Sequence, residues 1–408
     1  FSGAVTVSAG VLDLASGAVL SNLYPPVDVH VAQGATLRFP NNLYVGALEG
    51  NGLINGTTSN NIFRFGCDNS DSTFAGSFLQ AGGTPDGPGV DKLGKGTATI
   101  TAPLGTLGSW LGVTDGTLRM YDNGSSPAGT RVYGGATLLF DDTGTHVDNR
   151  TQSTYVGGEY KVLGSLSANT AAGGPANTQF QFTLLGNPTL TLVPGTGFEA
   201  QYRQRNGGDN NMCGVGPEVT AFVRGDGLAQ ASGTRSRFTI QSQNFNTVLI
   251  GGAGQVMADS VAPNPPGQAG TPQVSVIYRM YGDNSSTGLG SGFVTYDRGP
   301  DHQQDDDDPG VRLLTASEYA TTLADGAGGV LSTIANTKLS TAVAGINSAT
   351  RVNTLLLEDN GSVSGAGMLT VESGLIMSTG SNGAIDAAGL ATGTGGAVRL
   401  ITPEATDQ

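Results

Sequence analysis

The chain has 408 residues, a formal net charge of −14 at pH 7, and only 13% charged side chains beside 65 glycines. An ordinary globular enzyme carries roughly a quarter charged residues, so this composition is atypical of that class. No basic cluster is present that would neutralise phosphates, and we expect no nucleic-acid partner. No apolar run reaches the roughly 18 residues of a membrane-spanning helix, and we expect no such segment.

One short phrase recurs along the chain: a glycine, one or two small residues, then two large apolar residues separated by one other. A turn followed by such a two-residue alternation predicts a short strand with one buried face. The closest copies lie about 20–25 residues apart, a period typical of solenoids. The copies occupy residues 10–14, 34–39, 116–120, 135–140 and 367–371.

In chain order, residues 1–150 carry the clearest repeats, beginning with alternating valines at 5–7 and 27–31. Residues 151–310 predict an irregular β-rich continuation with loop insertions, because runs of alternating residues are separated there by loops rich in Gly, Asn and Pro. Residues 311–408 return to the repeat phrase after an acidic break. A brief helix is expected from residue 317 to 323, with Ser317 as its N-cap. The runs read as strands in the middle region are 180–184, 190–193, 219–223, 238–240 and 274–278.

These patterns predict an all-β chain folded as a β-solenoid, in which stacked coils bury a column of Val, Leu, Ile and Phe. Residues 48–54 match residues 363–369 in their glycine and apolar positions, which indicates one architecture at both ends. The first and last coils of such a column are open strand edges that another chain can extend. We therefore expect self-association, end to end or lateral.

Two segments resemble a known repeat. Residues 74–78, Phe-Ala-Gly-Ser-Phe, followed by residues 91–100, Asp-Lys-Leu-Gly-Lys-Gly-Thr-Ala-Thr-Ile, resemble the autotransporter-associated β-strand repeat. That phrase runs aromatic-x-Gly, a spacer, and Lys-x-Gly-x-Gly-Thr-Leu-Thr-Leu, so Ala98 departs from it. The resemblance covers the first third of the chain well and residues 351–377 moderately. It implies a right-handed parallel β-helix in a bacterial surface or secreted protein, and thus an extracellular or cell-surface location.

The acidic break is the candidate metal site. Carboxylates on a loop can ligate calcium, although the spacing here is not that of an EF-hand. The alternative is a solvated charged loop. Calcium is the one cofactor that the sequence suggests, and its candidate ligands are Asp301, Asp305, Asp306, Asp307 and Asp308.

Several other motifs favour an ordinary structural interpretation. Residues 89–96 nearly spell a phosphate-binding loop, but Gly96 stands where Ser or Thr must follow the lysine. His30 alternates with two valines and is expected on the polar face of a strand. Arg224-Gly225-Asp226 follows a predicted strand and reads as a turn. Glu358-Asp359 and Asp141-Asp142 are expected to end strands rather than to form catalytic pairs, because neighbouring strand residues point to opposite faces.

The two cysteines, Cys67 and Cys213, match no zinc spacing, and either a disulfide or two buried thiols is consistent with them. Asn-x-Ser/Thr triplets begin at residues 55, 123, 149, 284 and 360, as expected from a composition rich in Asn, Ser and Thr. The sequence begins with Phe1 rather than Met and shows no signal peptide. We therefore expect a processed form or part of a longer chain.

The sequence thus predicts a non-enzymatic extracellular structural protein that builds a fibre, sheath or surface layer, or an adhesin stalk. It offers no catalytic residue. The alternative is a β-helix that binds or cleaves polysaccharide, with Asp, Arg and aromatic residues on adjacent coils and cell-surface glycans as partners. The aromatic residues to inspect for that alternative are Tyr44, Trp110, Tyr121 and Tyr133.

Overall fold

The computed structural model divides the chain into two compact units, Phe1–Gln201 (unit 1) and Tyr202–Gln408 (unit 2). Both are built almost wholly from short β-strands. The residues that the structure describes are 3–15, 26–57, 61–80, 89–101, 105–106, 110–121, 129–147, 154–156, 159–167, 182–184, 189–192, 197–200, 220–228, 237–240, 249–250, 269–277, 280–297, 310–327, 334–379, 383–392 and 399–401.

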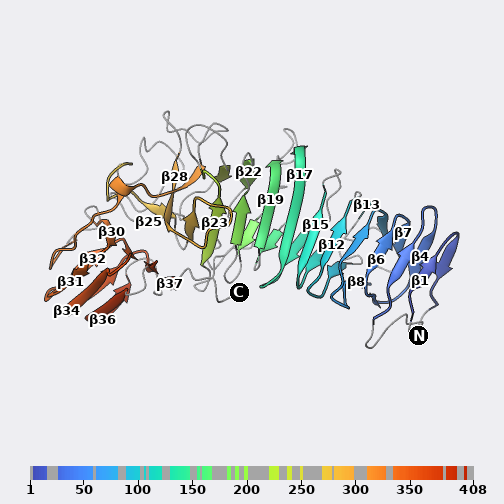
Figure 1. Ribbon diagram of the computed structural model, residues 1–408, viewed down its shortest axis with the longest axis horizontal. Helices are drawn as coiled ribbons and strands as arrows, with labels where there is room; N and C mark the ends of the chain where they lie inside the picture. Colours follow the sequence, from blue (N-terminus) through green and yellow to red (C-terminus); the bar gives the residue numbers. More distant parts are fainter. Residues whose placement is uncertain are drawn as a thin grey trace, which may run out of the picture. The chain divides into compact units, whose positions relative to one another are not determined.

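Unit 1 is a coil of three parallel sheets, and its successive strands lie side by side as rungs (Figure 1). Sheet 1 has the order β1 (Val5–Val7), β3 (Val29–Val31), β6 (Leu48–Gly50), β9 (Ser72–Phe74), β12 (Thr97–Ile100), β15 (Thr117–Met120), β17 (Thr137–Val147), β19 (Glu159–Ser167) and β21 (Thr189–Leu192), and β22 (Gly197–Ala200) also pairs with β19. Sheet 2 has the order β2 (Val11–Asp13), β4 (Thr36–Phe39), β7 (Leu53–Gly56), β10 (Ser77–Gln80) and β13 (Gly105–Thr106). Sheet 3 has the order β5 (Leu43–Tyr44), β8 (Phe63–Phe65), β11 (Val90–Lys92), β14 (Trp110–Val113), β16 (Gly129–Val132), β18 (Thr154–Val156) and β20 (Phe182–Leu184).

The core of unit 1 is a set of apolar columns, each made by one strand position repeated from rung to rung. In sheet 1 the register stacks Ala98, Leu118, Leu138 and Tyr160, and all four are at most 1% exposed. The alternating sequence produces this result, since residues two apart on a strand point to the same face. The predicted β-solenoid with in-register apolar columns is therefore confirmed.

Glycines allow neighbouring rungs to approach closely at the corners. Gly50 has φ +96°, and a Cβ atom there would lie 2.1 Å from the carbonyl oxygen of Val31. Gly365 has φ +141°, and its Cβ would lie 2.3 Å from the carbonyl oxygen of Ile346. Only glycine fits such a position. The match between residues 48–54 and 363–369 thus reflects the same corner in both units.

Unit 2 combines parallel rungs with an antiparallel group. Its parallel strands form sheet 4, with the order β30 (Asn336–Leu339), β33 (Thr354–Leu357), β35 (Leu375–Ser378) and β37 (Arg399–Ile401), and sheet 5, with β31 (Ala342–Val343), β34 (Ser362–Val371), β32 (Thr350–Val352) and β36 (Ala384–Thr392). The remaining strands are β23 (Ala221–Gly225), β24 (Arg237–Ile240), β25 (Leu249–Ile250), β26 (Val276–Ile277), β27 (Met280–Asp283), β28 (Gly292–Asp297) and β29 (Gly310–Leu313). Here β23 pairs with β27 in parallel, whereas β25–β26, β27–β28 and β28–β29 are antiparallel.

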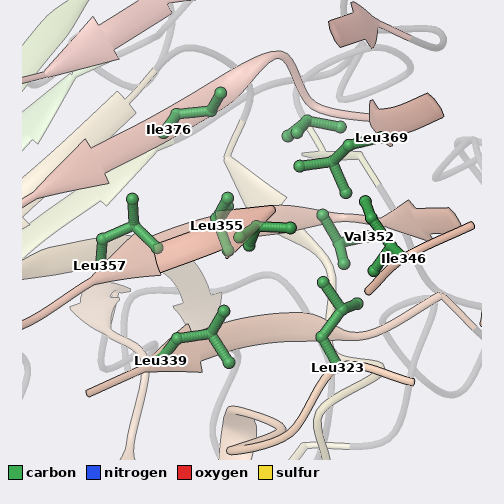
Figure 2. Packing of buried hydrophobic residues seen from close by; sticks show 10 residues of the cluster. Leu323, Leu339, Ile346, Val352, Leu355, Leu357, Leu369 and Ile376 are labelled. Carbon is green, nitrogen blue, oxygen red and sulfur yellow. The ribbon is translucent and has the colours of Figure 1, made fainter. Parts of the chain in front are cut away.

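Strand β33 of sheet 4 is buried on both faces, unlike the alternating strands of unit 1. All four residues of β33 are buried. Leu355, Leu357 and Ile376 face the core that sheet 4 shares with sheet 5 (Figure 2). Leu356 and Met377 face the other way and pack in the apolar cluster of the antiparallel group. A strand buried on both faces is apolar without alternation, which is why residues 354–357 read Thr-Leu-Leu-Leu.

The helix expected at residues 317–323 is shorter and begins earlier. One turn of 3₁₀ helix, η1, spans Ala316–Glu318, and its N-cap is Thr315, so Ser317 lies inside it and the N-cap prediction was wrong. The carboxylate of Glu318 accepts a hydrogen bond from the Thr315 backbone N–H at 2.8 Å. Tyr319 already has an extended backbone, so the turn ends there.

The five strand runs expected in the middle region coincide with β20, β21, β23, β24 and β26 within one to two residues at each end. Two of the Gly-, Asn- and Pro-rich stretches between these runs, residues 206–211 and 263–266, lie outside the described residues.

Candidate functional site

The predicted calcium ligands Asp301, Asp305, Asp306, Asp307 and Asp308 all lie outside the described residues, so the calcium site stays a prediction. Within the described ranges, no three His, Cys, Asp or Glu side chains form a group that could hold a metal ion.

The outward face of sheet 3 carries a row of polar and aromatic side chains on successive rungs. The register aligns Tyr44 with Arg64, Arg64 with Asp91, Asp91 with Gly112 and Gly112 with Arg131. We name these five residues the sheet 3 row. They stand one position from the core columns, so the alternation of each strand turns them outward.

Arg64 connects the first part of the row. Its guanidinium donates from one Nη to the hydroxyl of Tyr44 at 2.7 Å and lies over the Tyr44 ring, 4.8 Å from the centroid. Its Nε donates to Oδ2 of Asp91 at 3.2 Å. The tyrosine is 36% exposed, and the side chains of Arg64 and Asp91 are 18% and 24% exposed. The row is thus held in shape and partly open to solvent.

Asp91 is the carboxylate of the row. Partial burial raises its pKa, against the opposing effects of Arg64 and Arg131. Its carboxylate leans over Gly112, because a Cβ atom at position 112 would lie 2.2 Å from Asp91 Oδ1. Glycoside hydrolysis needs two carboxylates on opposite sides of one bond. Among the five residues of the row, Asp91 is the one carboxylate.

The other aromatic residues predicted for a glycan site do not all join this row. Tyr121 lies under the guanidinium of Arg119, 4.9 Å from it, beside sheet 1. Tyr133 follows β16 and is 47% exposed. The side chain of Trp110 lies outside the described residues.

No family model matches this chain. Neither the curated proteins nor the solved structures contain a match to it either. The resemblance to the autotransporter-associated repeat therefore stays a prediction from residues 74–78 and 91–100. In the described part of the chain, no helix is both long and apolar enough to cross a membrane.

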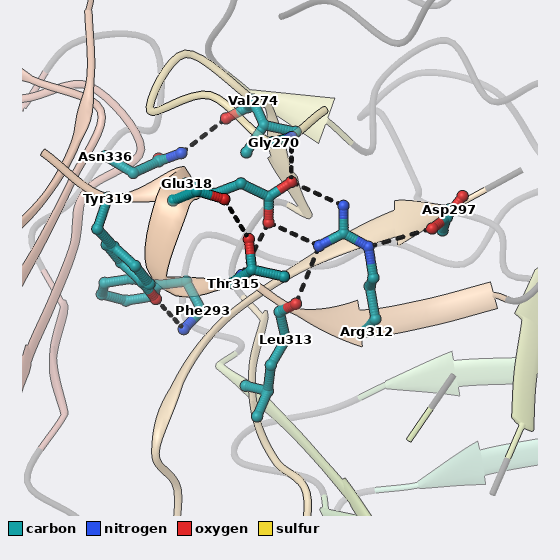
Figure 3. Close-up of polar contacts among 11 residues, drawn as sticks. Gly270, Val274, Phe293, Asp297, Arg312, Leu313, Thr315, Glu318, Tyr319 and Asn336 are labelled. Atoms are coloured by element: carbon teal, nitrogen blue, oxygen red, sulfur yellow. Dashed lines mark hydrogen bonds and ion pairs between the residues drawn. The ribbon is translucent and has the colours of Figure 1, made fainter. Parts of the chain in front are cut away.

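Unit 2 contains a buried ion pair that sequence reasoning missed (Figure 3). The two terminal nitrogens of Arg312 donate to the two carboxylate oxygens of Glu318, at 2.7 and 2.8 Å. Glu318 is 0% exposed and also accepts the backbone N–H groups of Gly270 and Thr315. Nε of Arg312 donates to Asp297 at 3.3 Å. Every group faces a partner, so the cluster fastens β28, β29, η1 and the segment at Gly270 together.

Two further side-chain contacts hold the same region: one joins the end of η1 to β28, and the other joins β30 of sheet 4 to the segment before β26. The Tyr319 hydroxyl accepts the backbone N–H of Phe293 at 3.2 Å, and the Asn336 amide donates to the carbonyl of Val274 at 2.7 Å (Figure 3). Because a buried polar group without a partner is costly, these contacts support a structural role. No signal in the local sequence could have paired residues so far apart along the chain.

Lys92 is a further residue whose role the sequence did not reveal. It ends β11 in a core column, in register with Phe65 and Val113, and is 0% exposed. Its ammonium donates to the carbonyl oxygens of Gly94 and Asp115. Burial lowers its pKa to about 8, although nearby carboxylates including Asp115 oppose this.

The near match to a phosphate-binding loop is therefore a strand, a corner and a strand. Residues 90–92 are β11, Gly94 has φ +70°, and β12 follows at Thr97. No helix begins there, so the feature that cradles phosphate is missing. The ordinary structural interpretation of this motif is confirmed.

The Arg-Gly-Asp tripeptide is engaged inside unit 2. One Nη of Arg224 donates a hydrogen bond to the carbonyl oxygen of Gly288 at 3.0 Å. The carboxylate of Asp226 accepts the backbone N–H of Ser286 at 2.8 Å and its hydroxyl at 2.9 Å. The turn prediction is right for Asp226, which begins a turn over residues 226–228, and wrong for Arg224 and Gly225, which belong to β23.

The remaining candidates also have structural surroundings. His30 alternates with buried Val29 and Val31, and its Nδ1 lies 3.9 Å from a carboxylate oxygen of Glu49. Glu358 follows β33 and pairs with Lys338, and Asp359 has φ +49°, as expected for a turn.

Asp141 of the other acidic pair is buried in β17 and binds Arg119, so the expectation that it ends a strand was wrong. Burial raises the pKa of the Cys67 thiol. Cys213, His302 and the side chains of His146 and Asp142 lie outside the described residues.

Proposed function

We propose that this chain is a non-enzymatic structural protein of the bacterial cell surface that associates with itself into a fibre, sheath or layer. The observation that carries the proposal is the state of the core columns at the last described strands of unit 2. Leu400 is in register with Ile376, and Ile376 with Leu355. Leu355 and Ile376 are 0% and 1% exposed, whereas Leu400 is 66% exposed.

A second column behaves in the same way. Leu390 of β36 is in register with Leu369 of β34, and the two are 43% and 0% exposed. Within the described ranges no strand pairs with the far edge of β36 or β37. Unpaired backbone groups beside exposed apolar side chains form a surface that another rung can cover. A second copy would continue the column with the same chemistry.

The use of charge supports a structural role. Some charged side chains in the described part of the chain pair between neighbouring rungs, as in the exposed pair Arg38–Asp13, the half-buried pair Lys338–Glu358 and the pair of Arg351 with buried Glu372. Such pairs fix register more than they add stability. The cell-surface assignment rests on the resemblance to the autotransporter-associated repeat.

The test is the molar mass of the full chain by light scattering as its concentration rises. We expect mass to increase with concentration, and we expect Leu390→Lys with Leu400→Lys to raise the required concentration about tenfold or more. Covering a leucine contributes about 1.5–3 kcal/mol, and 1.4 kcal/mol is a factor of ten.

Leu79→Lys is the matched control. Leu79 is 41% exposed, but its strand β10 has β7 on one side and β13 on the other. This variant should associate like the parent. A parent that keeps the mass of one chain at every concentration would contradict the proposal.

A further inference from the structure

The sheet 3 row has a geometry that the structural role does not use. Tyr44, Arg64, Asp91, Gly112 and Arg131 stand on five successive rungs. Parallel strands are about 4.8 Å apart, so four intervals extend roughly 19 Å along the coil. A ligand that contacts the whole row must be linear and must repeat on a similar scale. We propose that the sheet 3 row binds an uncharged linear polysaccharide lying along the axis of unit 1.

The chemistry of the row fits hydroxyl groups. Asp91 is acceptor-only when ionised, and the guanidiniums of Arg64 and Arg131 are donor-only, so the row offers both kinds of partner to a sugar hydroxyl. The Arg64 contact engages Oδ2 of Asp91, while Oδ1 lies above Gly112, which has no side chain. That oxygen is placed to accept a hydroxyl hydrogen bond.

The aromatic residues supply apolar contact to the faces of the sugar rings. Tyr44 is 36% exposed at one end of the row, and Tyr133, two residues after Arg131 on the same rung, is 47% exposed. Arg64 already holds the Tyr44 ring in place through its hydroxyl and its ring face. A preorganised side chain loses little freedom on binding, which favours affinity.

Charge decides between neutral and acidic polysaccharides. The row has two arginines and one aspartate, and Asp91 already neutralises Arg64. The whole chain carries −14, so a polyanion is repelled as it approaches. An uncharged chain meets no such barrier.

Affinity electrophoresis of the full chain tests the proposal, in native gels cast with hydroxyethylcellulose, dextran, soluble starch or, as the acidic polymer, alginate. We expect at least one neutral polymer to retard the protein and alginate to leave it unretarded. Tyr44→Ala and Asp91→Asn should each weaken the retardation about fivefold or more, the effect of removing one good contact.

Arg38→Ala is the matched control, because it removes an exposed cross-rung ion pair from sheet 2, and it should leave retardation unchanged. Asp91→Asn keeps the size of the side chain and remains informative if Tyr44→Ala fails to fold. Absence of retardation by all three neutral polymers would overturn the proposal, as would retardation that the folded variants do not change. Retardation by alginate alone would overturn the choice of an uncharged ligand.

Discussion

Gly50 shows how one residue sets the distance between rungs. Its φ of +96° is costly for any residue with a Cβ atom, and the carbonyl oxygen of Val31 occupies the space that this atom would need. Gly34 has a similarly positive φ of +77° but nothing within 4 Å of its Cβ position. A side chain at position 34 would therefore meet backbone strain alone, whereas one at position 50 would meet backbone strain and steric overlap together.

We predict that Gly50→Ala costs more than Gly34→Ala. Gly34→Ala should lower the free energy of unfolding by about 1–2 kcal/mol, because alanine disfavours the left-handed backbone. Gly50→Ala should lower it by at least about 1 kcal/mol more, because the neighbouring rung must also shift. Urea unfolding of the two variants measures both values. Equal costs would show that the close approach to Val31 contributes nothing.

Lys92 gives a prediction about pH. Its folded pKa of about 8 lies below its ordinary value of 10.5, so the unfolded chain binds more protons between these values. Stability must then rise as the pH rises through this window and be lower below it. We predict that Lys92→Met removes this rise and that the variant is at least as stable as the parent at pH 7. Urea unfolding at pH 7 and pH 9.5 measures the difference, and an unchanged rise would count against the buried amine.

At the scale of elements, the ion pair of Arg312 and Glu318 fastens η1 to β29. Burial raises the pKa of Glu318, but hydrogen bonds from Arg312, Gly270 and Thr315 outweigh this and hold it below its ordinary value of 4.5. A carboxyl with a lowered pKa stabilises the fold above 4.5, and that contribution is lost as the pH falls below it.

We predict that Glu318→Gln lowers the stability of unit 2 by about 3–5 kcal/mol at pH 7, since it leaves Arg312 buried with a weaker partner. The variant should also lose less stability than the parent between pH 6 and pH 3. Lys338→Met, which breaks the more exposed pair with Glu358, should cost less than about 1 kcal/mol. Hydrogen exchange at β29 and η1 reports the effect locally, and similar protection in parent and Glu318→Gln would refute it.

The strands and their buried faces were predictable because they follow from local alternation. Residues 36–39 and 117–120 belong to copies of the repeat phrase that predict strands with one buried face, and each is a strand with two buried positions in the structure. The sequence does not predict which residues of neighbouring sheet 3 strands stand side by side, and so does not predict the sheet 3 row. Arg64 and Asp91 are 27 residues apart, while Asp91 and Gly112 are 21 apart, because the loops between rungs differ in length.

Lys92 and the antiparallel group escaped sequence analysis for a related reason. Lysine at the end of a strand reads as polar and exposed, and only the register with Phe65 and Val113 shows that it is buried. Likewise β27, β28 and β29 have the composition of ordinary strands, and nothing in their alternation states the direction of pairing.

For the molecule as a whole, net charge bears on assembly. Copies carrying −14 repel one another, and the Debye length falls from about 30 Å at 0.01 M salt to about 8 Å at 0.15 M. Association driven by apolar surface is not weakened by this screening. We therefore predict that self-association strengthens over this range, measured by sedimentation velocity at one protein concentration. Weaker association at the higher salt would indicate contacts dominated by opposite charges.

Electron microscopy of the concentrated full chain at 0.15 M salt tests most directly the claim that this solenoid is a self-associating structural protein. The account predicts filaments or sheets whose repeat contains one chain, and their loss in the double variant Leu390→Lys with Leu400→Lys. Separate particles of one chain each, at every concentration, would contradict it.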